Sequence, residues 1–287
     1  MPRTGLVQRD AHRSVNVWII YVALPALTLR FIPNIHWNLD MLLPIAGPFL
    51  LWCGAWLYIK AYSSGKPVDA QTRTALLVTC GLGNTAFLGF PLTIAYYGKD
   101  ALSSAIVFDL STFIIFCILA MPVILRSACG GSQKFDLLTL AGRIFSFPAF
   151  VASIFAIASS FFVDMSFLNP LLDLLVATIS PLALFSIGLQ FEFRDFGQSA
   201  GHVAVGLLYK LVFAPLLVFL LALILGGGGE TFAVSVFEAG MPPHIMGSLL
   251  ASQFNQNPRL CGLMVAIGII TSMFTTALLW FMLGCVF

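Results

Sequence analysis

Residues 81–98 read GLGNTAFLGFPLTIAYYG, an apolar stretch that is interrupted where a membrane-spanning helix is normally continuous. The interruptions are four glycines, Asn84 and Pro91. Lipid offers no partner to opened backbone, so a helix breaks at membrane depth only where protein or a watery cavity faces the break. Proline lacks the backbone donor and glycine tolerates unusual dihedral angles, so we expect Gly89 and Pro91 to bracket the break. The stretch therefore predicts a binding site.

The composition around this stretch is that of an integral membrane protein. Of 287 residues, 59% are hydrophobic and 9% are charged, against roughly 25% charged residues in soluble domains. Apolar stretches of 17 to 25 residues recur along the chain, and this is the length that a helix needs to cross about 30 Å of hydrocarbon. The predicted fold class is all-α, a helical bundle rather than a β-barrel of short alternating strands.

Hydropathy predicts nine membrane-spanning helices in a single transmembrane domain, residues 1–287. The predicted spans cover residues 15–32, 41–59, 74–97, 102–125, 144–163, 168–190, 201–225, 231–252 and 260–286. With this arrangement, eleven Lys and Arg residues lie on the side of the N-terminus and two on the other side. Because positive residues gather on the cytoplasmic side, we expect a multi-pass protein of the cell membrane with its N-terminus cytoplasmic and its C-terminus outside.

The sequence also contains an internal repeat. ALPALTL (23–29) is echoed by ISPLALFSIGL (179–189), and the broken span with Pro91 by EAGMPPHIMGSLLASQ (238–253), at an offset of about 156 residues. An odd number of crossings separates the paired spans, so the halves, 15–125 and 144–286, are expected to form the inverted repeat of secondary transporters. Chance similarity between apolar segments is the alternative. The span at 144–163 has no partner, which predicts a five-plus-five fold without its first helix.

Two broken helices would place half-helix ends at the membrane midplane, where an N-terminus presents free N–H groups to an anion. The candidate substrate-binding residues are Asn84, Thr85, Gly89, Pro91, Pro242, Pro243, His244 and Gly247. Each has a plainer interpretation: an interhelical hydrogen bond for Asn84, a bond to its own helix for Thr85, a backbone partner for His244, and packing or kinking for the glycines and prolines.

Ionisable residues inside predicted spans are a second set of candidates, because charges at membrane depth are costly. Asp109, Asp173, Lys210 and Glu238 are candidates for ion or proton coupling, and the alternative for each is a structural ion pair. We expect Glu238 to lie near an outer cavity.

Several function classes lack support in the sequence. The six cysteines form no CxxC or Cys/His spacing, so no metal site or disulfide framework is predicted. No nucleotide-binding, metalloprotease or Ser/His/Asp pattern appears, so neither a cofactor nor an enzyme is expected. The net charge of +2 is small and scattered, which argues against a nucleic-acid partner.

Four segments in order resemble the auxin efflux carrier family: YVALPAL (21–27), GNTAFLGFPL (83–92), SPLALFSIGL (180–189) and EAGMPPHIMGSLLASQFN (238–255). The resemblance implies ten helices in two inverted repeats, with two broken crossing helices as in sodium–proton antiporter and bile-acid symporter folds, and substrates that carry a carboxylate. It also implies that Asn84 lies at the substrate site, that Pro91 is a crossover proline and that Gly247 lies near the second one. GLVQRDAHRSVN (5–16) resembles the loop after the family's first helix, so that helix is expected to be absent.

The predicted function is a secondary carrier, or permease, that exports a small organic anion such as a carboxylate or an auxin-like acid. One alternative is import of the anion coupled to Na⁺ or H⁺, and another is a membrane sensor or remnant that does not transport. The expected partners are the anion, the lipid bilayer, a coupling proton or sodium ion, and a second copy in a homodimer. Substrate, coupling ion, direction of flux and oligomeric state stay open.

Overall fold

The computed structural model describes residues 11–35, 38–128, 142, 145, 148–160, 162, 165–189 and 199–286. Within these residues the regular secondary structure is helical, and the only bridge is an isolated antiparallel pair, Gly83 with Pro243. The all-α fold class is therefore confirmed for the part of the chain that is described.

Helices lie in all nine of the predicted ranges. In chain order they are α1 (Ala11–Trp18), η2 (Ile19–Ala23), α2 (Leu24–Phe31), α3 (Leu42–Gly65), α4 (Ala70–Cys80), η5 (Thr85–Gly89), α5 (Phe90–Tyr97), α6 (Leu102–Ile115), η6 (Phe116–Ala120), α7 (Met121–Ala128), α9 (Pro148–Ser160), α10 (Asn169–Ala177), α11 (Ile179–Leu189), α12 (Ala200–Leu208), η9 (Tyr209–Phe213), α13 (Ala214–Ile224), α14 (Glu230–Ala239), α15 (Ile245–Gln253) and α16 (Pro258–Gly284). The segments η2, η5, η6 and η9 are single turns of π-helix.

In the part of the chain that the structure describes, six continuous helical stretches are long and apolar enough to cross a membrane. They are Ser14–Asn34, Leu39–Gly65, Leu102–Ala128, Ser166–Ala183, Ala200–Ile224 and Pro258–Gly284. The chain is therefore an integral multi-pass membrane protein. Helix α9 has 13 residues, and the half-helices α4, α5, α14 and α15 are each too short to cross alone, so the count of nine crossings and the inverted repeat stay predictions.

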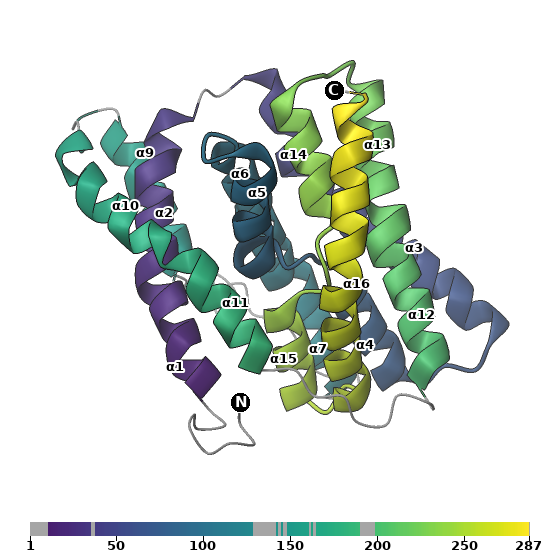
Figure 1. The fold of residues 1–287 in the computed structure, drawn as a ribbon. Coiled ribbons are helices and arrows are strands. Elements are labelled where there is room, and N and C mark those ends of the chain that lie inside the picture. Colours follow the sequence, from purple (N-terminus) through teal and green to yellow (C-terminus); the bar gives the residue numbers. More distant parts are fainter. Residues whose placement is uncertain are drawn as a thin grey trace.

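The helices form two groups, on the left and right of Figure 1. In the first, which we call the side bundle, α2 packs against α9 and α10, and α1 packs against α11. The second, the main bundle, contains α3, α4, α6, α7 and α12–α16, and α5 lies between the two groups beside α6. One buried apolar cluster lies within the main bundle, and the other spans both groups, with Leu27 of α2 and Ala105 of α6 among its residues. Contacts of α2 with α6 also join the groups.

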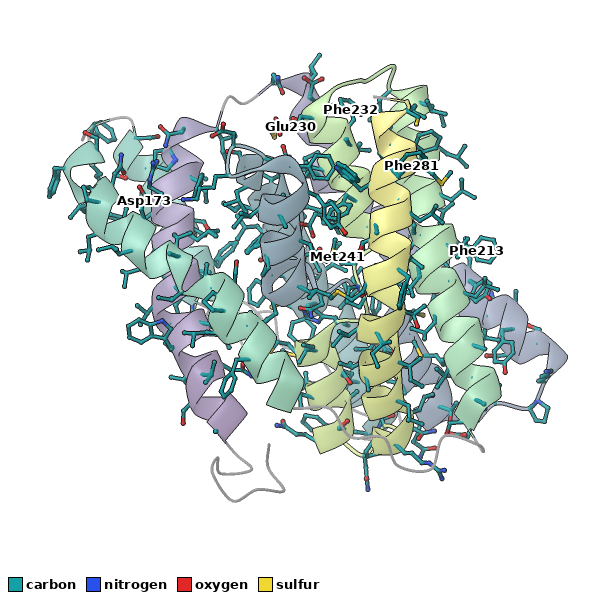
Figure 2. All side chains as sticks on the ribbon, viewed as in Figure 1. Asp173, Phe213, Glu230, Phe232, Met241 and Phe281 are labelled. Atoms are coloured by element: carbon teal, nitrogen blue, oxygen red, sulfur yellow. The ribbon has the colours of Figure 1, made fainter. Side chains whose placement is uncertain are left out.

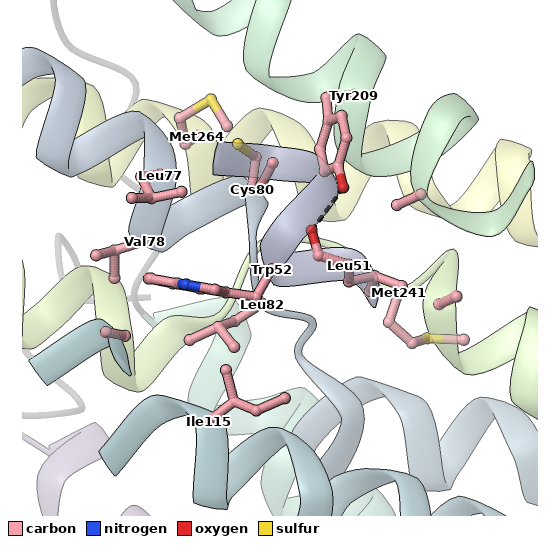
Figure 3. Packing of buried hydrophobic residues seen from close by; sticks show 14 of the residues in the cluster. Leu51, Trp52, Leu77, Val78, Cys80, Leu82, Ile115, Tyr209, Met241 and Met264 are labelled. Atoms are coloured by element: carbon pink, nitrogen blue, oxygen red, sulfur yellow. Dashed lines mark hydrogen bonds between the residues drawn. The ribbon is translucent and has the colours of Figure 1, made fainter. Parts of the chain in front are cut away.

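The main bundle is closely packed inside and apolar outside. Figure 3 shows Trp52 and Leu82 in its core, where the buried Tyr209 hydroxyl donates a hydrogen bond to the Leu51 carbonyl at 2.6 Å. Outward-facing side chains such as Phe213 and Phe281 are exposed at the rim of the bundle (Figure 2). An apolar exterior around a packed interior is what a surface in contact with lipid requires.

Asp69 caps α4 outside the apolar spans, and its carboxylate accepts a hydrogen bond from the Thr72 amide at 2.8 Å. Desolvation alone would raise the pKa of Asp69, but the hydrogen bonds from Thr72 lower it below its usual value. The stabilisation that this cap gives the folded state is therefore fully present above the unfolded-state pKa of Asp69 and is lost as the pH falls through the folded-state pKa.

We expect Asp69→Ala to lower the free energy of unfolding by about 1 kcal/mol at neutral pH. The loss should shrink below about pH 4, measured by thermal unfolding in detergent. Asp69→Asn, which keeps a capping oxygen, should retain most of the stability; an equal loss would contradict the capping role.

Candidate functional site

The first helix break lies at Gly81–Asn84, between the end of α4 and the start of η5. Gly89 and Pro91 are helical, and Pro91 stands in the first turn of α5. The expectation that these two residues bracket the break is therefore wrong. The physical reason is that the π-turn η5 continues directly into α5, and such a local change of helix type lets the helix accommodate the missing amide of Pro91 without ending.

The second break lies at Gly240–His244, between α14 and α15, and it contains Pro242 and Pro243 as expected. Gly247 lies outside it, in the first turn of α15. The Nδ1 atom of His244 accepts a hydrogen bond from the Gly247 amide at 3.0 Å and so caps that helix. Because a backbone amide can only donate, neutral His244 carries its proton on Nε2.

The two breaks cross and satisfy one another. The backbone N–H of Asn84 donates a hydrogen bond to the Pro242 carbonyl at 2.8 Å, and Gly83 pairs with Pro243 as a short antiparallel bridge. Backbone groups that lack a helical partner in one break are thus hydrogen-bonded to the other break, which lies in the other half of the chain. The crossing also brings Asn84 and His244 to matching positions, each directly before the first residue of a half-helix.

A cavity of about 460 Å³ lies beside the crossing, between the two bundles. Its described lining is Ile20, Tyr21, Leu24, Asn84, Ala86, Phe87, Asp109, Phe113, Phe116, Cys117, Met121, Pro148, His244 and Met246. The polar groups Asn84, Asp109 and His244 belong to the main bundle or the crossing, whereas the side bundle contributes apolar groups and Tyr21. The cavity can therefore hold a molecule with one polar end and an apolar body.

The polar groups of the cavity differ in what they can offer a ligand. The Thr85 hydroxyl donates to Asp109 Oδ1 at 2.5 Å, so its proton is already used. The side chain of Asn84 is 2% exposed, and its Nδ2 atom has no hydrogen-bond partner among the described residues. An unpaired buried donor costs about 1–3 kcal/mol, and a ligand oxygen would remove that cost.

Two ionisable side chains are buried behind the cavity. Lys210, in η9, is fully buried, and its Nζ atom donates to the Ala239 carbonyl at the end of α14 at 2.6 Å. Glu238 is also fully buried, and its Oε1 atom accepts from the Thr93 hydroxyl at 2.8 Å. The expectation that Glu238 lies near an outer cavity is wrong, because its side chain points from α14 to α5 across the crossing.

The sequence of residues 2–280 matches the family described as "Membrane transport protein". The chain belongs to this family. Its resemblance to the auxin efflux carriers is confirmed with it.

Curated proteins across bacteria and archaea are similar to this transporter. An uncharacterized transporter of Methanothermobacter thermautotrophicus is 25% identical, over 86% of this chain and 81% of that protein. The uncharacterized transporter YfdV of Escherichia coli is 23% identical, over 97% of this chain and 90% of its own length. A protein of Rhizobium meliloti named "Putative malonate transporter" is 26% identical, over 79% of this chain and 73% of that protein.

The remaining predicted residues of this transporter are distributed unequally. Asp173 lies on α10 in the side bundle and pairs with Arg30 at 2.9 Å, with 44% of its side chain exposed. Figure 2 shows it across the molecule from Met241 in the second break. The structure therefore does not bring Asp173 to the crossing, whereas Asp109, Lys210 and Glu238 are all there.

The sequence did not predict the residues that form the apolar wall of the cavity. Ile20 and Tyr21 come from η2, Phe87 comes from η5, and Phe116 comes from η6, so three turns of π-helix line one cavity. Turns of π-helix inside α-helices are frequent at functional sites. The sequence carries no pattern that distinguishes them from the surrounding helix, so no signal could have located them.

Proposed function

We propose that this membrane transporter is a secondary carrier for a small organic anion that has one carboxylate and an apolar body. The observation that supports this most is the cavity beside the crossing, where Asn84 and His244 provide donors and aromatic side chains provide the rest of the wall. Half-helix N-termini behind both residues add partial positive charge, which favours a carboxylate.

The proposed binding mode uses Asn84 and His244, which directly precede the two half-helices, as a pair. The Asn84 amide group and the Nε2 proton of His244 would each donate to the carboxylate, and Phe87, Phe113 and Phe116 would contact the apolar body. Malonate, the substrate named for the Rhizobium meliloti relative, has a second carboxylate. The described lining holds no Lys or Arg to receive it, so we expect a monocarboxylate to bind more tightly than malonate.

Lys210 argues against sodium coupling within this proposal. In symporters with broken helices, half-helix C-terminal ends and opened carbonyls coordinate the coupling cation. Here the Lys210 ammonium group already binds the carbonyl of Ala239 at the end of α14. We infer that the Lys210 ammonium group occupies the position in which a coupling sodium ion would bind, and that flux does not depend on sodium.

The test is flux into proteoliposomes with labelled benzoate and malonate, with and without sodium. We expect Asn84→Ala to lower benzoate flux about 10-fold or more, because a hydrogen bond to a charged group is worth about 1.5–3 kcal/mol. The matched control is Asn34→Ala, at an exposed asparagine whose side chain donates to the Arg30 carbonyl. Equal flux in wild type and Asn84→Ala would contradict the site.

A further inference from the structure

Asp109 is the one acidic side chain in the described lining of the cavity. It stands on α6 and is half-buried, so protons can reach it from the cavity. Its Oδ1 atom accepts a hydrogen bond from the hydroxyl group of Thr85, the residue after Asn84, and this bond holds the carboxyl group in place. The group is thus fixed at the polar end of the cavity, where the carboxylate of a substrate would also bind.

Two carboxylates in one cavity repel each other, and like charges at close range favour proton uptake by one of them. No Lys or Arg in the described lining compensates for a second negative charge. Protonation of Asp109 would remove its charge and would also turn the group into a donor, because a carboxylic acid has an O–H to offer. One proton therefore changes Asp109 from a group that repels the anion to one that binds it.

The other titratable groups around Asp109 have different positions. Glu238 on α14 interacts electrostatically with Asp109 and Lys210, but Glu238 and Lys210 are fully buried behind the cavity and oppose each other in charge. His244, in the second break, is fixed by Gly247 with its proton on Nε2. Tyr21 in η2 and Cys117 in η6 share the lining and bring a hydroxyl and a thiol group. Within the described lining, Asp109 is therefore the group whose negative charge would repel an arriving anion.

We propose that Asp109 takes up one proton when the cavity binds an organic anion, so that proton and anion cross the membrane together. This inference rests on the proposed function. The proton comes from the water of the cavity and returns to water when the anion leaves, so nothing else is consumed. The carrier would then be driven by a proton gradient, and it would move no net charge with a monocarboxylate.

The test is calorimetric titration of the purified full-length carrier with benzoate, which stays ionised between about pH 6 and pH 8, in buffers of different ionisation enthalpy. Wild type should take up close to one proton per benzoate, and its affinity should fall up to about tenfold per pH unit over the range in which Asp109 loses its proton. Asp109→Asn keeps a neutral donor of the same shape, so it should bind benzoate with no proton uptake and with an affinity independent of pH. Asp173→Asn, at the carboxylate paired with Arg30, is the matched control and should behave as wild type.

Flux in proteoliposomes provides the second readout. An inward proton gradient should accelerate benzoate uptake by wild type and by Asp173→Asn, but not by Asp109→Asn. Benzoate binding to wild type without proton uptake would overturn the inference and leave the proposed function standing, as would unchanged proton uptake in Asp109→Asn. Absence of binding by benzoate and malonate at every pH would overturn both.

Discussion

Replacing Lys210 with methionine should destabilise the crossing more than any other single substitution of a charged residue in the described main bundle. Methionine fills a similar volume, but it leaves the buried Ala239 carbonyl without its donor and removes a group that interacts electrostatically with Glu238. Leaving a buried acceptor without its partner costs about 1–3 kcal/mol, and more where a charged group is involved. We expect a fall of that size in the stability of the carrier, measured by thermal unfolding in detergent, with loss of benzoate flux.

A double variant separates the charge effect from simple loss of packing. Lys210→Met removes a positive group that interacts with the Glu238 carboxylate, and Glu238→Gln removes the negative charge of that carboxylate. The double variant should therefore be more stable than the sum of the two single losses predicts, by about 1–3 kcal/mol, as contacting residues in one network usually are. Strict additivity would show that Lys210 and Glu238 do not act as a pair.

Sodium provides a control on the role assigned to Lys210. If the ammonium group serves in place of a coupling cation, the Lys210→Met variant has lost a positive charge at the end of α14, where a small cation can be attracted. Sodium should then raise the unfolding temperature of Lys210→Met and leave that of wild type unchanged, with choline as the matched salt. A stabilisation of wild type by sodium would contradict the inference that flux is independent of sodium.

The helices were predictable from sequence because their cause is local. A run of about 20 apolar residues is enough to predict a span, and each of the nine predicted ranges contains helix. The position of the first break was not predictable, because the helical run of η5 and α5 accommodates Pro91 and the chain opens before this run, at Gly81–Asn84. There Gly83 pairs with Pro243, 160 positions further along the chain, and no local pattern reports that pairing.

The site was predictable in part for the same reason. Asn84 and His244 could be named because each adjoins an interruption that is visible in the sequence, and both line the cavity. Partners that come from distant segments could not be named: Thr93 for Glu238, Arg30 for Asp173, and Ala239 for Lys210. A charged residue within an apolar span signals a cost, but only the tertiary structure shows which group compensates for it.

Gly89→Ala should produce the second large effect, through a single added methyl group. A Cβ atom at Gly89 would overlap both carboxylate oxygens of Glu238 and lie 2.9 Å from its Cδ atom. Because the carboxylate is the end of a flexible side chain, it can move away, but the move would cost it the hydrogen bond from Thr93. A lost hydrogen bond to a charged group costs about 1.5–3 kcal/mol. We expect a loss of that size, measured by thermal unfolding, with reduced benzoate flux.

Gly262→Ala is the matched control, because Gly262 lies in α16 and a Cβ atom there would meet no other atom within 4 Å. Alanine is favoured over glycine in a helix, so this variant should be as stable as wild type or gain up to about 1 kcal/mol. Combining Gly89→Ala with Glu238→Asp, which withdraws the carboxylate by one methylene, should recover part of the loss. If Gly89→Ala were as stable as Gly262→Ala, the close contact of the Glu238 carboxylate with Gly89 in η5 would not contribute to stability.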